Sequence, residues 1–517
     1  MSHALRAALL MLVWLTVPAA AAPEPPAAPK PLYALSGHTA EIYTVAFGPD
    51  GKRVASASNQ DVRVWDVTTG KEVFTYLTKG TNVFGLAFSP DGKTLAVSVS
   101  KQVRLLDAGT GQQRQIITHP THFLFRMTFS PDGKHLLTTA GSTGNTGDVR
   151  IWEVATGKEV LKFAGHKEAP LSAAYSGDGR LVASGSGGTM KVMPGEVKVW
   201  EADTGREVQT LRGHADNVYG VSFSPDGKYV ASCGGVRGQA KAGTVKLWEV
   251  ASGKEVFALE GHTGPVFTVA YSPDGRRLAT ASGDRSVRVW EAATGKEVLN
   301  LPAHDGVVYS VAFSPDGKRL ATAGQDRQVK VWELNLPAAG EGAPLTAKQL
   351  DVLWADLSGA DAAKAYRGVW SLAAVPKQAL PYLKERVRPA APLTAEQEKQ
   401  LAQWLRDLDD DEFTVREQAT KLLTGLGEGA LPALRRALKD DPPPEVRRRV
   451  EEVLEALTGA ATPDRLGTLR AVDVLESIGT PEAREVLRKL ASGLPEARVT
   501  QEAQRSLDRL TRRADGH

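Results

Sequence analysis

The chain has 517 residues and a formal net charge of +3, because 63 Lys and Arg nearly balance 60 Asp and Glu. This balance argues against a general nucleic-acid binder, which needs a basic surface to displace counterions. The single cysteine, Cys233, excludes a disulfide within the chain and a cysteine-rich zinc site. The length predicts about two to four domains.

The first 21 residues have the pattern of a secretory signal peptide. Arg6 precedes an uncharged apolar run over 7–17, and the small residues Ala19 and Ala21 follow at the spacing of a cleavage site. The apolar run is shorter than the ~20 residues that span a bilayer. We therefore predict cleavage after Ala21, a linker over 22–30, and export to the periplasm or the medium. The alternative is an uncleaved membrane anchor.

Internal repeats organise residues 31–335. A five-residue phrase recurs seven times: VRVWD (62–66), VRLLD (103–107), VRIWE (149–153), VKVWE (197–201), VKLWE (245–249), VRVWE (287–291) and VKVWE (329–333). Each copy follows a turn phrase such as SPDGK, and a second turn phrase such as ATGKE follows the first six copies. Short runs of β-branched and aromatic residues lie between the turns and predict four antiparallel strands per repeat.

These phrases, in this order, resemble the WD40 family, and the resemblance implies a seven-bladed β-propeller over residues 31–335. The seventh repeat stops at Glu333 without a fourth strand, whereas a strand-like run over 31–35 precedes the first repeat. We expect residues 31–35 to supply the outer strand of blade seven, because an open ring would expose sheet edges.

The resemblance also implies hydrogen-bonded tetrads of His, Ser or Thr, Asp and Trp, which give the histidines a structural role. Two blades carry the full set, which comprises His262, Thr280, Asp284 and Trp290 in blade six, and His304, Thr322, Asp326 and Trp332 in blade seven. Blade one offers Asn59, Gln60 or Asp61 in the acidic position, and blades three to five are expected to lose this position inside insertions. His119 and His122 are expected to replace the missing Gly-His of blade three rather than to bind a metal.

Glycine-rich insertions lengthen three consecutive blades. They lie between the second and third strands of blades three, four and five, at 141–147, 185–195 and 233–243. Loops on a rigid scaffold are a usual place for binding, and Lys191, Arg237 and Lys241 give this sector a positive character. The alternative is neutral drift of the loops.

One position near the start of each blade is aromatic in six of seven repeats. The aromatic residues are Tyr43, Phe84, Phe125, Tyr219, Phe267 and Tyr309, and Leu171 takes the position in blade four. The resemblance implies that this position lines the mouth of the central channel. Such a collar would hold an Arg or Lys side chain by cation–π contact, or an aromatic or proline-rich peptide by stacking. The alternative is packing between blades.

The composition changes after a Pro-, Ala- and Gly-rich linker over 336–345. From 346 to 517 the apolar residues recur with a helical period, which predicts roughly eight to ten helices. We expect a capping box from Thr394 to Gln397 and helix breaks at prolines that include Pro381. A resemblance to HEAT-type repeats, which implies a HEAT-like domain with a binding surface, is found at 412–423, 430–438 and 445–457.

The sequence contains no recognisable catalytic or phosphate-binding motif. We therefore expect an exported, non-enzymatic scaffold of bacterial type that binds a peptide or protein on the loop-rich face of the propeller. No cofactor, metal, nucleic acid or membrane-spanning segment is expected in the mature protein. The alternative is an exported hydrolase whose site lies among the inserted loops near Asp148 and Glu196. A third possibility is that the helices dimerise the chain.

Overall fold

The structure, a computed structural model, describes residues 30–120, 122–142, 147–163, 165–188, 193–239, 241–334, 344–458 and 463–514. The predicted signal peptide over 1–21, the linker up to residue 29, and most of the linker over 336–345 lie outside these residues. Lys191 also lies outside them.

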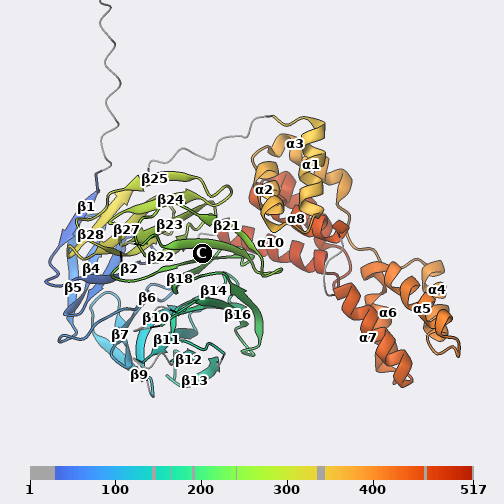
Figure 1. The fold of residues 1–517 in the computed structure, drawn as a ribbon, viewed down its shortest axis with the longest axis horizontal. Coiled ribbons are helices and arrows are strands. Elements are labelled where there is room, and N and C mark those ends of the chain that lie inside the picture. The colour runs from blue at the N-terminus through green and yellow to red at the C-terminus, as the bar shows by residue number, and fades with distance from the viewer. Residues whose placement is uncertain are drawn as a thin grey trace, which may run out of the picture. The chain divides into compact units, whose positions relative to one another are not determined.

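Seven four-stranded antiparallel sheets form the blades of a β-propeller (Figure 1). Blade one contains β2 (Ile42–Phe47), β3 (Arg53–Ser58), β4 (Asp61–Asp66) and β5 (Lys71–Leu77). Blade two contains β6 (Leu86–Phe88), β7 (Thr94–Val99), β8 (Gln102–Asp107) and β9 (Gln113–Thr118). Blade three contains β10 (Phe123–Phe129), β11 (His135–Gly141), β12 (Gly147–Glu153) and β13 (Glu159–Phe163).

The remaining four blades follow in chain order. Blade four contains β14 (Pro170–Tyr175), β15 (Leu181–Ser186), β16 (Glu196–Glu201) and β17 (Glu207–Arg212). Blade five contains β18 (Asn217–Phe223), β19 (Tyr229–Gly235), β20 (Thr244–Glu249) and β21 (Glu255–Leu259). Blade six contains β22 (Val266–Tyr271), β23 (Arg277–Ser282), β24 (Val287–Glu291) and β25 (Glu297–Leu301). Blade seven contains β26 (Val308–Phe313), β27 (Arg319–Gly324), β28 (Gln328–Glu333) and β1 (Tyr33–Ser36).

The first strand of the chain closes the ring. β1 pairs antiparallel with β28, from Tyr33 opposite Val331 to Ser36 opposite Gln328. Leu35 on this strand is buried in a cluster that joins blade seven to blade one. The arrangement is the one that the incomplete seventh repeat predicts, and it leaves no unpaired edge on β28.

The second strand of each blade is buried almost throughout, as in β23, where only Arg277 is partly exposed. Neighbouring blades cover both faces of this strand, so a continuous run of small and apolar residues replaces the alternation of a half-exposed strand. The three inserted loops lie between the second and third strands, as expected: β11 ends at Gly141, β15 at Ser186 and β19 at Gly235.

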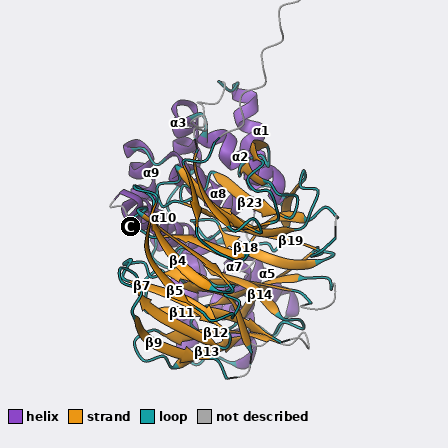
Figure 2. Cartoon of the chain, turned by 90° about the vertical axis from the view of Figure 1, so that its left-hand side faces the viewer, coloured by secondary structure: helices purple, strands orange, loops and turns teal. Residues whose placement is uncertain are grey.

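Ten α-helices follow in the described residues after 344 (Figure 2). They are α1 (Ala347–Ser358), α2 (Ala362–Ala373), α3 (Pro376–Arg386), α4 (Ala395–Asp407), α5 (Phe413–Gly425), α6 (Leu431–Lys439), α7 (Pro444–Thr458), α8 (Pro463–Ile478), α9 (Pro481–Ala491) and α10 (Arg498–Ala514), with a short 3₁₀ turn, Gly427–Ala430, before α6. The capping box predicted at Thr394 and Gln397 opens α4. The helix break expected at Pro381 is wrong, because this proline lies inside α3. None of the described helices is long and apolar enough to cross a membrane.

The helices form two hydrophobic cores rather than one continuous stack. Helices α1, α2 and α3 share a core with α8, α9 and α10, and α4 to α7 enclose a second core. The last three helices therefore return to the first three, which sequence order alone does not indicate.

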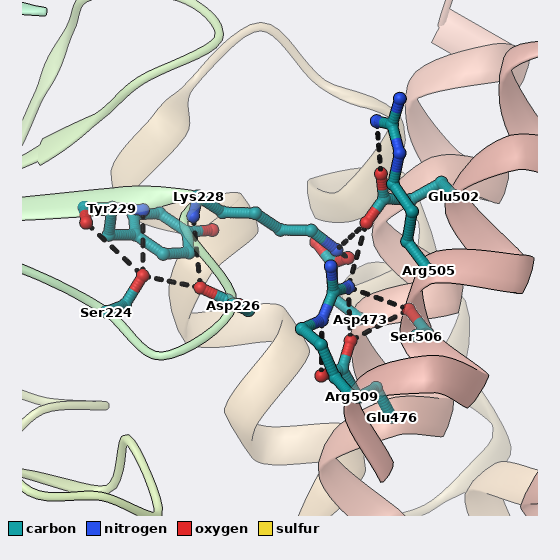
Figure 3. Close-up of polar contacts among 10 residues, drawn as sticks. All are labelled: Ser224, Asp226, Lys228, Tyr229, Asp473, Glu476, Glu502, Arg505, Ser506 and Arg509. Carbon is teal, nitrogen blue, oxygen red and sulfur yellow. Dashed lines mark hydrogen bonds and ion pairs between the residues drawn. The ribbon is translucent and has the colours of Figure 1, made fainter. Parts of the chain in front are cut away.

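Helices of the first core pack against blades five and six. Tyr366 of α2 is 2% exposed and lies edge-on to Tyr229, with ring centroids 4.5 Å apart. Arg470 of α8 forms an ion pair with Glu249 at 3.1 Å. Lys228, in the turn between the first two strands of blade five, pairs with Asp473 and Glu502 (Figure 3). This turn lies at the opposite end of the strands from the aromatic collar.

Candidate functional site

All seven collar positions line one cavity of about 720 Å³. Its lining includes Tyr43, Phe84, Phe125, Leu171, Tyr219, Phe267 and Tyr309, one from each blade. We call this cavity the funnel. Its size lies within the ~300–1,000 Å³ typical of ligand sites. The collar predicted from the sequence therefore exists as a structural feature.

The six aromatic rings form a continuous arc around the funnel. Neighbouring centroids lie 5.1 Å apart for Tyr43 and Phe84, and 5.3 Å apart for Tyr43 and Tyr309. The arc continues from Tyr309 through Phe267 to Tyr219 and from Phe84 to Phe125 at 5.3–6.2 Å. Tilted contacts at these distances are the favoured arrangement of aromatic pairs. The collar thus both lines the funnel and packs blade against blade, so the two interpretations of these residues are compatible.

In six of the seven blades the collar residue lies at a β-bulge, whereas Phe84 of blade two precedes the first strand. In blade one the pairing of β2 with β3 shifts between Ile42 and Thr44, so Tyr43 is the extra residue. The same shift is found at the collar position of blades three to seven. A bulge bends the strand and redirects one side chain.

The residue after the collar position forms a second, deeper level of the channel. Six blades have small residues there: Thr44, Gly85, Ser172, Gly220, Thr268 and Ser310. Blade three has Arg126, which lines the funnel and donates hydrogen bonds to the hydroxyls of Thr44 at 3.2 Å and Thr268 at 3.4 Å. The sequence analysis missed Arg126, although comparing the seven repeats at this position would have revealed it.

The inserted loop of blade five reaches the funnel. Val236 and Arg237 line it, and the Arg237 guanidinium lies 5.6 Å from the ring centroid of Tyr309. Lys241 is not among the lining residues and forms an ion pair with Asp216 at 2.9 Å. Of the two described basic residues predicted for this sector, Arg237 is therefore the one that the structure places at the funnel.

The tetrads predicted for blades six and seven are present. His262 contacts Thr280 at 2.7 Å and Asp284 at 2.8 Å, and Trp290 donates to Thr280 at 2.9 Å. The same contacts join His304, Thr322, Asp326 and Trp332 at 2.8–2.9 Å. Burial acts to raise the pKa of Asp284, but the hydrogen bond and the charge of His262 together with hydrogen bonds from Ser286 outweigh it and hold the pKa below its usual value.

Blades one, three and four also have an acidic partner, which in blade one is Asp61, one of the three candidates named from the sequence. Asp61 contacts His38 and Asp148 contacts His119 at 2.8 Å, so His119 is structural, as expected. Glu196 lies 3.7 Å from His166. The expectation that blades three to five lose the acidic position is therefore wrong for blades three and four. In a longer loop, the residue at the start of the third strand faces the histidine instead.

In blade five Thr244 takes the place beside the histidine that an acid has in blades one, three, four, six and seven. His214 contacts the hydroxyls of Thr244 at 2.8 Å and Ser232 at 2.7 Å. Burial, followed by the nearby charge of Lys246, lowers the pKa of His214 to about 4. The unfolded chain therefore binds one more proton than the folded chain between about pH 4 and 6.5, and stability falls as the pH drops through this window.

Replacement of the threonine by an acid is expected to reduce this acid sensitivity. Thr244→Asp places a carboxylate beside His214 and raises the pKa of the imidazole. When the pH drops from 6.5 to 4, the free energy of unfolding of this variant should therefore fall by about 1–3 kcal/mol less than that of the unchanged protein. Denaturant unfolding at several pH values measures the difference, with Thr244→Asn as the uncharged control. Equal pH dependence in both variants would contradict the expectation.

The described residues offer little acid–base or metal chemistry at the funnel. Arg126 and Arg237 are the charged side chains of its described lining, and no group of His, Cys, Asp or Glu in the described residues is arranged to hold a metal ion. Asp148 and Glu196 are held by His119 and His166, and the pKa of each is lowered, whereas a general acid needs a raised pKa.

Comparison with known protein families agrees with this architecture. The WD40 model (WD domain, G-beta repeat) matches residues 29–66, 70–107, 157–192, 205–249, 253–291 and 295–333. The unmatched stretch from 108 to 156 contains the first three strands of blade three. No curated protein matches the chain. The six matches and the seven observed blades together identify the chain as a WD40-repeat β-propeller followed by a C-terminal helical domain.

Proposed function

We propose that the protein is an exported, non-enzymatic scaffold that holds a segment of a protein partner in the funnel. WD40 propellers commonly act as protein-interaction scaffolds. The observation that carries the proposal is the collar of six aromatic residues around an open cavity of about 720 Å³. Aromatic side chains supply much of the binding energy at protein interfaces because they bury a large area at low entropic cost.

A non-enzymatic role is favoured over the alternative of a hydrolase among the inserted loops. The two carboxylates nominated for that alternative, Asp148 and Glu196, are occupied by the histidines of their blades. The described funnel lining contains no acid and no histidine that would serve as a general base.

Export is supported by the order of charged, apolar and small residues over 1–21. We place the mature protein in the periplasm or the medium of a bacterium. Mass spectrometry of the N-terminus after expression in such a host tests this placement, and a mature chain that begins at Ala22 is the expected result.

A second binding surface is proposed on the helical domain. Helices α5, α6 and α7 lie where the sequence resembles HEAT-type repeats, and together with α4 they enclose their own core. Helix pairs of this kind present curved surfaces to partners.

The collar is tested by removing two of its half-buried rings. Phe84→Ala combined with Tyr219→Ala is expected to weaken partner capture by the full chain at least tenfold, because both rings line the funnel. Crosslinking of a captured partner to the funnel, read by mass spectrometry, measures the effect. Val160→Ala truncates a side chain that is 54% exposed on the outer strand of blade three and is not part of the funnel lining, and it serves as the control. Capture that survives the double change would contradict the proposal.

A further inference from the structure

The channel beneath the collar holds a positive charge without a counter-ion. Arg126 reaches from blade three to Thr44 in blade one and to Thr268 in blade six. These three blades surround the axis, so the guanidinium lies across the channel. Both hydrogen-bond partners of the guanidinium among the described residues are neutral hydroxyls, and no carboxylate of these residues lies within ion-pair distance of it.

Such an arrangement is unfavourable, because the Arg126 side chain is only partly exposed, at the lining of the funnel. Buried charges are normally paired, because removing a charge from water without a partner is unfavourable. The pKa of Arg126 is lowered, and burial is the main cause. A second arginine of blade three is paired in this way, since Arg150 forms an ion pair with Asp148 at 2.8 Å and also contacts Glu159.

A second guanidinium lies at the mouth of the same cavity. Arg237 is exposed and extends over Tyr309. Glu41, an acid beside this rim, accepts hydrogen bonds from Tyr309 at 3.2 Å and Gln325 at 3.1 Å and is not part of the described funnel lining. The described lining therefore combines two positive charges with aromatic rings, which is complementary to an anion flanked by apolar groups.

We propose that the funnel takes an acidic segment of the partner and that an aspartate or glutamate side chain of this segment binds Arg126. The inference rests on the proposed function and specifies the chemistry of the ligand. A chain cannot thread past the guanidinium that crosses the channel, so a side chain is inserted from the mouth. Apolar neighbours of the acid then pack on Tyr43, Phe84 and Tyr219, and Arg237 contacts a second acid at the rim.

The first test compares stability in two variants. Because Arg126 has no counter-ion, Arg126→Met is expected to leave the melting temperature unchanged or to raise it by about 1–2 °C. Arg150→Met is the matched control from the same blade and should lower it, because Asp148 loses its partner. A fall of several degrees in Arg126→Met would show that the guanidinium is structural and would overturn the proposal.

The second test uses a phage-displayed library of random heptapeptides, selected on the full chain. The expected peptides share an Asp or Glu next to aromatic or aliphatic residues. Replacement of this acid by its amide should weaken binding to the unchanged protein about tenfold or more, and to Arg126→Met less than twofold. Peptides that bind without an acid and equally well to Arg126→Met would overturn the anion site and leave the proposed function standing.

The remaining outcomes distinguish the proposed binding site in the funnel from the proposed anion site at Arg126. They also distinguish a side-chain carboxylate of the ligand from its C-terminal carboxylate. Selected peptides that lose binding to the Phe84→Ala, Tyr219→Ala variant support the funnel as their site. Failure to select any peptide would overturn both proposals. Each peptide is also synthesised with a free and with an amidated C-terminus. Equal affinity supports an inserted side chain, whereas loss of binding on amidation would overturn it in favour of a terminal carboxylate.

Discussion

Deletion of residues 31–36 is expected to destabilise the propeller more than any other change of similar size outside its core. The deletion removes β1 together with the buried side chain of Leu35. It also removes the four-residue ladder that β1 forms with β28. The lost apolar burial contributes about 1.5–3 kcal/mol and each lost hydrogen bond about 0.5–1.5 kcal/mol. The free energy of unfolding should therefore fall by roughly 4 kcal/mol or more.

A sharp decrease in melting temperature, measured by calorimetry, checks this expectation. The deletion also leaves β28 as a free edge, so light scattering should rise with protein concentration. A chain that begins at Pro31 is the control, because it keeps the whole of β1. An unchanged melting temperature after deletion of 31–36 would show that closure of blade seven does not stabilise the ring.

Tyr366→Ala is expected to separate the helical domain from the propeller. Tyr366 is 2% exposed and lies 4.5 Å from Tyr229 and 5.8 Å from Phe257, measured between ring centroids. Truncation of a buried aromatic side chain typically costs about 3–5 kcal/mol. The ion pairs around it, from Lys228 to Asp473 and from Arg470 to Glu249, do not replace the lost packing.

Calorimetry and limited proteolysis measure this separation. The variant should show two thermal transitions in place of one, and faster cleavage between 334 and 344. Tyr382→Ala is the matched control, because Tyr382 is a half-buried tyrosine of α3 that bonds to Asp351 within the helical domain. The same behaviour in both variants would show that Tyr366 does not hold the two parts together.

Regularities that repeat along the chain made the propeller predictable. Each SPDGK turn and each Val-Lys-Val-Trp strand depends on neighbours in the sequence, so the same local pattern gives the same element seven times. The collar was predictable for a similar reason, because one bulge position recurs in register across the repeats. The tetrads of blades six and seven were implied by the resemblance to WD40 repeats, carried over position by position.

The departures from the repeat were harder to interpret. Asp148 and Glu196 directly follow the inserted loops in the sequence, and each lies at the start of a third strand and meets a histidine there. Whether an acid in a variable loop reaches its histidine depends on where the strand begins, and the loop length alone does not give this point. Arg126 is recognisable only when the seven repeats are compared at the position after the collar, where the other six residues are small.

The sequence by itself determined the seven blades, the strand that closes them, the helical nature of the C-terminal part, and the aromatic collar. Local turn chemistry, hydrophobic period and repetition are sufficient for these features. Only the tertiary structure decided that α8 to α10 return to α1 to α3, that Tyr366 and Arg470 attach them to blades five and six, and that Arg126 crosses the channel without a counter-ion. These features depend on contacts between residues far apart in the chain, and a short sequence pattern does not encode such contacts.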